Sequence, residues 1–172
     1  KQYADGHWGE VKTLAAYIPQ PFCAFGDPCI VCDRESNRVM VTSCCGNVGF
    51  PGGTYNNHQG WARWYSEDGG ETWESNFTDL APQVVAWLDK RKNDQMQAFF
   101  IGSGKISQSS TIKVGKYYRL YCASNTRMQS GKCNFVWYSD DFGETWNMLG
   151  DPDVKPINGG DEPKADEMPD GS

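Results

Sequence analysis

The sequence of 172 residues contains no run of about 18 consecutive apolar residues, so we predict no membrane-spanning helix. No apolar stretch follows the N-terminal lysine of "KQYADGHWGE", so no signal peptide is expected in this chain, and whether one was removed or lies outside it stays open. Apart from the run Lys90–Lys92 the sequence has no cluster of Lys and Arg, and the net charge is −6. Because phosphate contacts need such clusters, nucleic acid is not an expected partner, although a local group of arginines would permit an anionic small ligand.

The seven cysteines are an odd number, and they lack the paired spacing of a zinc knuckle. The C-x-x-C of Cys29–Cys32 has no second pair to complete a zinc site, because the cysteines at 44–45 are adjacent. We therefore expect no metal and predict free buried thiols that behave as small hydrophobic residues. A disulfide between Cys122 and Cys133 in an oxidising compartment remains the alternative, so cysteine usage leaves the compartment open.

Aromatic residues, glycines and prolines are plentiful. Aromatic residues make up 13% of the chain, which also holds 19 glycines and 9 prolines, a composition that favours short strands joined by turns. Apolar residues mostly recur with period two, the period of a strand. Six strands are predicted, at Pro28–Asp33, Arg38–Cys44, Gly60–Ser66, Gly104–Lys113, Lys116–Ala123 and Cys133–Ser139. The first two are expected to form a hairpin through the polar turn "RESN".

The third of these strands is predicted to present Trp61, Arg63 and Tyr65 on one face and the residues between them on the other. A long polar loop precedes it at Gly46–Gln59, and loops of this length often carry function. The strand rhythm is broken at Ala81–Asn93, where apolar residues at helical spacing and an early proline predict a short surface helix.

One phrase occurs twice, as "YSEDGGETW" at Tyr65–Trp73 and as "YSDDFGETW" at Tyr138–Trp146. Seven of the nine positions are identical, and the copies begin 73 residues apart. Each copy follows a predicted strand, and its serine and aspartate suit a turn, while its glycine suits a backbone conformation that is costly for other residues. Its tryptophan is expected to pack between sheets. We therefore interpret the phrase as scaffold and not as a reaction centre.

Self-similarity at this long period predicts stacked or radially arrayed sheets, and a β-propeller with four-stranded blades is the natural candidate. The predicted blade units span about 25–80 and 100–150, and a further blade is expected to begin at 158–172. Its opening strand is predicted at Glu162–Ser172 and is expected to run into a Pro-Asp-Gly turn. The smallest propellers have about four blades, so two blades do not close a ring. We therefore expect residues 1–172 to be a partial propeller domain, either an internal fragment of a larger protein or one piece of a nicked one.

The pattern S-x-D-x-G-x-T-W in both phrases resembles the Asp-box of sialidases and related propellers. It is matched at Ser66, Asp68, Gly70, Thr72 and Trp73, and again at Ser139, Asp141, Gly143, Thr145 and Trp146. The resemblance implies a structural role for these ten positions. It also implies an all-β fold, the six-bladed sialidase-type β-propeller, of which this chain holds about two blades and the start of a third.

Three other stretches resemble bacterial exo-α-sialidases, so the resemblance covers nearly the whole chain. "FGDPCIVCDRESNRVMV" is similar to the D-P blade opening of the family, which implies that Asp27 binds the O4 side of the sugar; a cap on the turn before Pro28 is the alternative. "FIGSGKISQS" resembles a glycine-rich rim segment, which implies that Ser103 and Gln108 contact the glycerol or aglycone side; a structural bulge is the alternative. Trp61 is the matching candidate for the aromatic rim beside the acyl pocket.

The third stretch, "NGGDEPKADEMPDGS", resembles the N-E-P-x-x-x-E-L-x-D-G strand of the family, with Asp161 where asparagine is common. This implies that Glu162 is catalytic and hydrogen-bonds the nucleophilic tyrosine; a simple strand-start glutamate is the alternative. A tyrosine hydroxyl avoids the repulsion that the substrate's own carboxylate would exert on a carboxylate nucleophile, but its pKa of about 10 requires a neighbouring base. Glu167 is expected to face solvent.

The resemblance implies that the complete protein is an exo-α-sialidase, which hydrolyses terminal sialic acid with retention through a tyrosyl intermediate and without a cofactor. Its expected partners are sialylated glycans and the remaining propeller blades, and its expected location is secreted, periplasmic or at the cell surface. The R-I-P motif, the acid/base aspartate, the arginine triad and the tyrosine of the family have no counterpart here, so this chain alone is expected to be inactive. The rival hypothesis is a non-catalytic Asp-box propeller that binds a glycan or a protein, and a weaker one is another glycosidase on the same scaffold.

Overall fold

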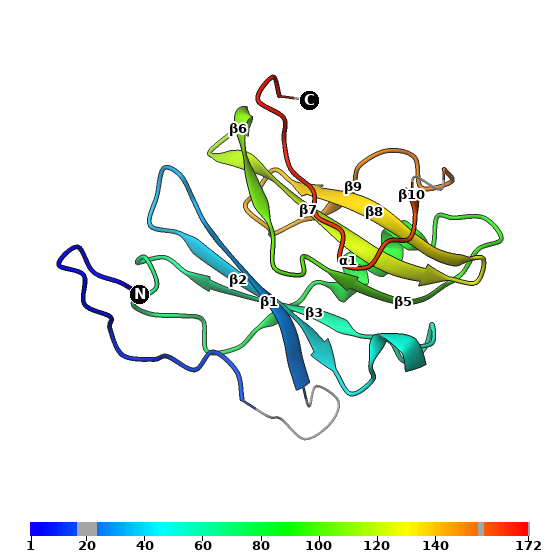
Figure 1. Cartoon of the computed structure of the whole chain (residues 1–172), viewed down its shortest axis with the longest axis horizontal. Coiled ribbons are helices and arrows are strands. Elements are labelled where there is room, and N and C mark those ends of the chain that lie inside the picture. The colour runs from blue at the N-terminus through cyan, green and yellow to red at the C-terminus, as the bar shows by residue number, and fades with distance from the viewer. Residues whose placement is uncertain (17–23, 155–156, 172) are drawn as a thin grey trace.

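Two antiparallel β-sheets, joined in sequence by one short helix, make up the protein (Figure 1). The structure is a computed structural model that describes residues 1–16, 24–154 and 157–171. The first sheet has the order β1-β2-β3-β4, with strands at Ala24–Cys32, Val39–Gly46, Gly60–Ser66 and Thr78–Asp79. The second has the order β10-β8-β7-β5, with β6 paired to β7 and β9 to β8. Its strands, from β5 to β10, are Met96–Ile101, Ser107–Val114, Tyr117–Met128, Gly131–Ser139, Asn147–Met148 and Ile157–Asn158.

The first sheet forms where the alternating sequence predicts it. β1 and β2 make the expected antiparallel hairpin, with Ile30 opposite Val41, and β3 has the predicted bounds. A bulge between Gly26 and Cys29 interrupts β1 and leaves Asp27 outside the regular pairing. A 3₁₀ turn at Phe50–Gly52 is the regular element within the long loop after β2.

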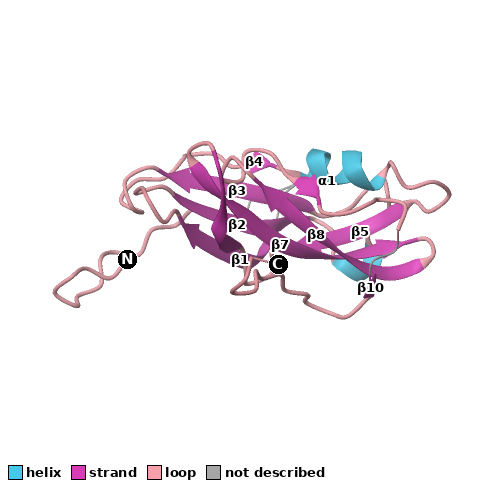
Figure 2. Cartoon of the chain, turned by 90° about the horizontal axis from the view of Figure 1, so that it is seen from above, coloured by secondary structure: helices cyan, strands magenta, loops and turns pink. Residues whose placement is uncertain are grey.

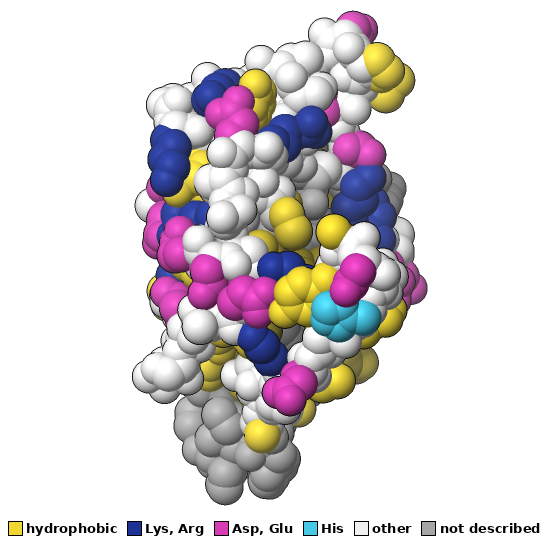
Figure 3. Space-filling model, turned by 90° about the vertical axis from the view of Figure 1, so that its left-hand side faces the viewer, with side chains coloured by type: hydrophobic (Ala, Val, Ile, Leu, Met, Phe, Trp, Pro, Cys, Tyr) yellow, Lys and Arg dark blue, Asp and Glu magenta, His cyan; other side chains and the backbone are white. Residues whose placement is uncertain are grey.

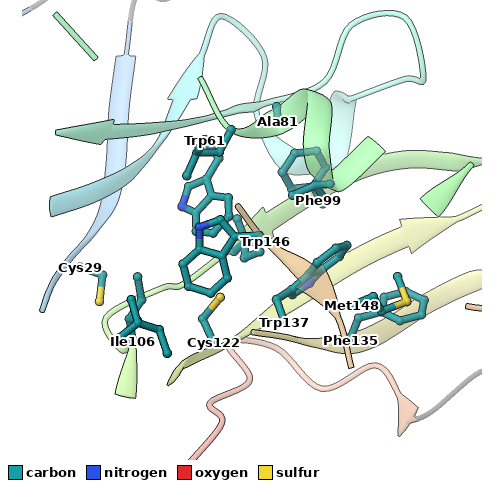
Figure 4. Close-up of a cluster of buried hydrophobic side chains, with 14 of the residues drawn as sticks. Cys29, Trp61, Ala81, Phe99, Ile106, Cys122, Phe135, Trp137, Trp146 and Met148 are labelled. Carbon is teal, nitrogen blue, oxygen red and sulfur yellow. The ribbon is translucent and has the colours of Figure 1, made fainter. Parts of the chain in front are cut away.

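The two faces of β3 join two different hydrophobic clusters, as the alternation predicts. Trp61 and Tyr65 belong to the larger cluster, which contains residues of both sheets (Figure 4). Trp64 lies on the other face and packs with Trp73 in a smaller cluster. In the larger cluster the ring centroids of Trp61 and Trp146 are 5.0 Å apart. The two sheets therefore share one core.

The predicted helix is confirmed, but it is shorter than expected. α1 spans Ala81–Leu88, whereas the prediction extended to Asn93. Val84 and Leu88 are buried, and the helix lies beside the strands at one side of the molecule (Figure 2). Residues 89–93 are all polar or charged, so they offer no apolar side chain that would extend this buried stripe. No helix in the described ranges is long and apolar enough to cross a membrane.

The second sheet contains the other three predicted strands with shifted ends, and it also contains β5, which was not predicted. Cys122 on β7 lies opposite Trp137, and Cys133 on β8 lies opposite Thr126. The two cysteines are thus four ladder positions apart, about 13 Å at roughly 3.3 Å per residue, whereas a disulfide needs Cα atoms within about 7 Å. Both cysteines are buried, and this separation is too large for a bond between them, so the disulfide alternative is wrong. Of the other described cysteines, Cys32 is exposed and three are buried and free, and the seventh cysteine lies outside the described residues.

The predicted opening strand near the C-terminus is not formed. Pairing in this region is limited to β10, and residues 159–171 contain no strand. Pro163 and Pro169 lack the N–H that a ladder needs. The expected turn is present, since Gly171 N donates to Met168 O at 2.8 Å. The boundaries of the blade units, including the end at residue 172 outside the described residues, stay a prediction.

Candidate functional site

Asp27 lies at the bulge of β1, and its backbone is in the left-handed region with φ of 49°. A residue other than glycine is strained in this conformation, and such strain often accompanies a functional site. Asp27 is exposed and borders a groove of about 310 Å³, which continues along Asn47 and Gln59. A carboxylate at the edge of a groove is suited to accept hydrogen bonds from the hydroxyl groups of a ligand.

The loop before β6 brings Ser103 against Asp27. Ser103 is buried, and its Oγ donates a hydrogen bond to Oδ1 of Asp27 at 3.4 Å. Gly102 and Gly104 on either side have φ of 71° and 67°, a conformation that glycine adopts readily. Two residues predicted to contact substrate are therefore in contact with each other, although they come from different sheet units.

Glu162 is exposed and also has a left-handed backbone, with φ of 52°. The segment that follows it runs beside β6, where Lys105 pairs with Asp166 and Ser107 Oγ donates to a backbone carbonyl of the segment at 3.1 Å. The stretch from 103 to 107 therefore contacts both Asp27 and the segment that carries Glu162. This stretch is the structural link between the sequence-predicted site positions.

Glu167 does not face solvent as expected, because it is half-buried and fastens the same segment to β6. It accepts hydrogen bonds from the hydroxyl of Ser109 and from the backbone N and hydroxyl of Ser110, the latter two at 2.9 and 2.8 Å. These hydrogen bonds, led by that of Ser109, lower the pKa of Glu167 to about 2. The carboxylate is therefore part of the scaffold that holds the segment in place.

A buried amide lies next to the Glu162 segment. Asn125 on β7 is fully buried, and its Nδ2 donates to Asp161 at 3.2 Å, while its Oδ1 has no hydrogen-bond partner among the described residues. Lys132 Nζ lies 2.9 Å from Asp161, and its hydrogen bond and charge hold the pKa of that carboxylate below its usual value. Sequence reasoning missed Asn125 because nothing in an alternating strand marks one amide. Only the packing of Asp161 onto β7 reveals it.

Two predicted substrate contacts are corrected by their surroundings. Trp61 is fully buried in the shared core, so its ring cannot stack on a sugar. Gln108 contacts the β1–β2 turn, where its Nε2 donates to Asp33 at 2.9 Å and its Oε1 accepts from the backbone N of Arg34 at 3.0 Å. Both polar groups of this amide are used between the two sheets. We therefore assign Gln108 to packing between sheets and not to substrate binding.

Each repeated phrase folds into the same hydrogen-bonded loop. In the first repeat loop (Tyr65–Trp73), Ser66 Oγ donates to Asp68 at 2.8 Å and accepts from Gly70 N at 2.8 Å, and Thr72 Oγ1 donates to Asp68 at 2.6 Å. The second repeat loop (Tyr138–Trp146) has the same contacts at 2.8, 2.7 and 2.6 Å, made by Ser139, Asp141, Gly143 and Thr145. The serine, aspartate and threonine side chains of the pattern are thus satisfied within the loop, as a turn requires.

The fold and the site define an antiparallel β-sheet protein with an open groove beside Asp27. The described residues contain no group of three or more His, Cys, Asp or Glu side chains placed to hold a metal ion. Neither a protein-family model nor a curated protein matches the sequence. The structure is similar to the solved structure named Hadza microbial sialidase Hz136, with a TM-score of 0.62 and 16% identity over 84% of this chain. This chain spans 29% of that sialidase chain, and at this identity the likeness shows the fold alone.

Proposed function

We propose that this chain is part of the six-bladed β-propeller of an exo-α-sialidase, which releases terminal sialic acid from glycoconjugates. One observation carries the proposal: within a sialidase-like fold, the 103–107 stretch contacts both Asp27 and the segment of Glu162. These are the positions that match sialidase motifs in the sequence. The two repeat loops are then Asp-boxes, which shape the blades and take no part in the chemistry.

Each site residue has a distinct role in this proposal. Asp27 accepts a hydrogen bond from the O4 side of the sugar, and Ser103 orients the carboxylate through its hydrogen bond. Glu162 hydrogen-bonds a tyrosine hydroxyl supplied by the remaining blades, and it withdraws the proton as the oxygen attacks the anomeric carbon. The glycosidic bond breaks in this step, and the acid/base aspartate of the remaining blades protonates the departing aglycone. Water then releases the sugar from the tyrosyl intermediate, so the anomeric configuration is retained. The remaining blades also supply the arginines and the acid/base aspartate, so this chain alone does not turn over substrate.

The test is a fluorogenic sialoside assay on the full-length protein that contains this chain. Glu162→Gln keeps the shape of the side chain but removes the base, so kcat is expected to fall by roughly 10²–10⁴ with a small change in KM. Asp27→Asn is expected to raise KM because it weakens a contact to the sugar. Glu10→Gln is the matched control, since Glu10 is an exposed carboxylate on the N-terminal segment, and it is expected to leave both constants unchanged.

Two results separate the proposal from its rivals. A full-length protein that binds the sialoside without cleaving it supports a non-catalytic propeller. Cleavage that persists unchanged in Glu162→Gln contradicts the role given to this glutamate.

A further inference from the structure

The two sheets have equivalent positions, because each repeat loop begins at the same place in its ladder. Val39 lies opposite Ser66 in the first sheet, and Leu120 lies opposite Ser139 in the second. Both serines are the second residue of their repeat loops. Arg119 directly precedes Leu120, and Arg38 directly precedes Val39. The register therefore makes Arg119 the equivalent of Arg38 in the first sheet.

Arg38 and Arg119 also make the same local contacts. Each guanidinium pairs with the acidic residue at the third position of its own repeat loop, Glu67 at 2.8 Å for Arg38 and Asp140 at 2.6 Å for Arg119. Each also lies over the ring of the tyrosine that opens that loop, 3.9 Å and 4.4 Å from the ring centroid. The equivalence thus holds for side chains as well as for backbone register.

Arg38 has a further partner, the glutamate of the second repeat loop. Glu144 accepts hydrogen bonds from Arg38 Nη2 and Arg63 Nη1, both at 2.8 Å. Beside it, the hydroxyl of Tyr65 donates to the backbone carbonyl of Phe142 at 2.6 Å. The second repeat loop is therefore docked on the first sheet by a carboxylate held by guanidinium groups and by a tyrosine bonded to its backbone.

The equivalent surface of the second sheet carries no repeat loop in the described part of the chain. This surface, the Arg119 face, consists of Arg119, Tyr121, Val136 and Tyr138, and all four side chains are partly exposed. The Arg119 side chain is 22% exposed, whereas that of Arg38 is 13% exposed beneath its loop. Nε and Nη2 of Arg119 donate to Asp140 at 2.6 and 2.9 Å, so these two nitrogens of the guanidinium bind its own repeat loop. The second sheet therefore has an arginine and a tyrosine equivalent to those that hold the second repeat loop on the first sheet. No repeat loop of another sheet is bound to them among the described residues.

The first repeat loop shows that this glutamate position binds cationic groups from outside its own sheet. Glu71, the equivalent of Glu144, lies 2.8 Å from Lys1 Nζ and 3.5 Å from Lys12 Nζ, and it accepts a hydrogen bond from the Tyr3 hydroxyl at 3.0 Å. All three partners come from the N-terminal segment, and basic and acidic side chains lie close together at this end of the molecule (Figure 3). In both loops the same carboxylate thus makes the contact to the neighbouring segment.

We propose that the Arg119 face is a docking surface for the acidic repeat loop of a further sheet unit of the same repeat. The glutamate of that loop binds Arg119, and the hydroxyl groups of Tyr121 and Tyr138 lie beside it as donors. The loop "YSEDGGETW" carries three carboxylates, so its charge is complementary to a surface centred on a guanidinium. The inference rests on the proposed propeller for the existence of that further unit and on the repeat geometry for the contact, and it is independent of catalytic activity.

The test uses a backbone-cyclised peptide with the sequence of residues 65–74 as the probe. Its ends suit cyclisation, because Glu74 N donates to Tyr65 O at 3.0 Å in the folded loop. The peptide is titrated into the isotope-labelled chain of 172 residues, and binding is followed by amide NMR. Saturable shifts are expected at residues 117–121 and 136–140. The same peptide with Glu71→Gln is the matched ligand control, and it is expected to produce no saturable shift.

Variants of the chain complete the experiment. Arg119→Gln is expected to abolish the shifts, whereas Lys116→Gln, which removes an exposed cation from the preceding turn, is expected to preserve them. The spectrum of each free variant reports whether its ladder is intact, so loss of binding is distinguished from loss of fold. The proposal is overturned by an absence of saturable shifts at millimolar peptide, by an equal response to both peptides, or by unchanged binding to Arg119→Gln.

Discussion

Phe142 shows how strongly the repeat loop constrains individual residues. It has a left-handed backbone with φ of 59°, at the position that Gly69 occupies in the first loop with φ of 72°. This conformation costs a residue other than glycine about 1–3 kcal/mol. Phe142 is fully buried, and its ring stacks on Tyr117 with centroids 5.3 Å apart, so packing offsets the strain. The hydrogen bonds of the loop therefore impose its shape even where glycine is replaced.

The repeat offers a matched pair of substitutions, Gly70→Ala and Gly143→Ala. Both glycines have positive φ, 90° and 86°, so alanine is strained by a similar amount at each. At Gly70 the new Cβ would be 3.7 Å from the Trp73 ring, but at Gly143 it would be 2.3 Å from Met40 Sδ. We expect Gly70→Ala to lower the free energy of unfolding by about 1–3 kcal/mol, and Gly143→Ala by about 1–3 kcal/mol more, because it overpacks the contact between the sheets.

Urea denaturation of both variants, followed by circular dichroism, measures the difference. Equal losses of free energy would show that the second repeat loop is not tightly packed on the first sheet.

At the scale of elements, Glu144 joins the second repeat loop to β2 and β3. Its partners Arg38 and Arg63 have side chains that are only 13% and 7% exposed, so these guanidinium groups depend on the carboxylate. We expect Glu144→Gln to lower the free energy of unfolding by about 1–3 kcal/mol. The control is Glu35→Gln, whose pair with Lys113 is exposed and contributes about 1 kcal/mol or less.

A double-mutant cycle with Arg63→Gln measures the coupling directly in urea denaturation. If Glu144→Gln and Glu35→Gln destabilise the protein equally, the contact between the loop and the sheet is no stronger than an ordinary surface pair.

Strands β3 and β5 show what the alternation of side chains along a strand can predict. β3 has the predicted bounds and faces, because its alternate side chains enter two separate clusters. β5 was missed because its apolar residues are consecutive at Ala98–Ile101, so "MQAFFI" has no alternation to read. Trp61 was assigned to the right face, but its partner was not predictable. Alternation indicates which residues share a face of a strand, but it does not indicate whether a second sheet covers that face.

The candidate site was predictable only in part, for the same reason. Asp27, Ser103 and Glu162 were singled out by motif, and the loop that contacts both Asp27 and the Glu162 segment emerges from the packing of two sheets. Gln108 is a polar side chain of the kind that contacts a sugar. Only its position at the β1–β2 turn shows that its amide is hydrogen-bonded to Asp33 and Arg34. Asn125 has no sequence signal at all. Long-range pairing, which a single sequence does not encode locally, decides these assignments.

At the scale of the whole molecule, the shared core predicts that the two sheets unfold together. The larger cluster combines side chains of the first sheet, such as Trp61, with side chains of the second, such as Trp137. Unfolding either sheet alone would expose large aromatic surfaces of the other sheet to water, at a free-energy cost of roughly 25 cal/mol per Å² of apolar surface. We therefore expect a single cooperative transition in urea, although the molecule contains two separate sheets.

The buried thiols provide probes on both sides of this core. Cys44 and Cys45 lie on β2, and burial raises their pKa to about 11 and about 12, while Cys122 and Cys133 lie on β7 and β8. All four are expected to resist a thiol reagent in the native state and to become reactive over the same range of urea, as read by pulse labelling and mass spectrometry. Exposed Cys32 is the internal control, and it should react at every urea concentration. If the β2 thiols react at lower urea than the β7 and β8 thiols, each sheet unfolds as its own unit, and the core contact between Trp61 and Trp146 is then too weak to couple them.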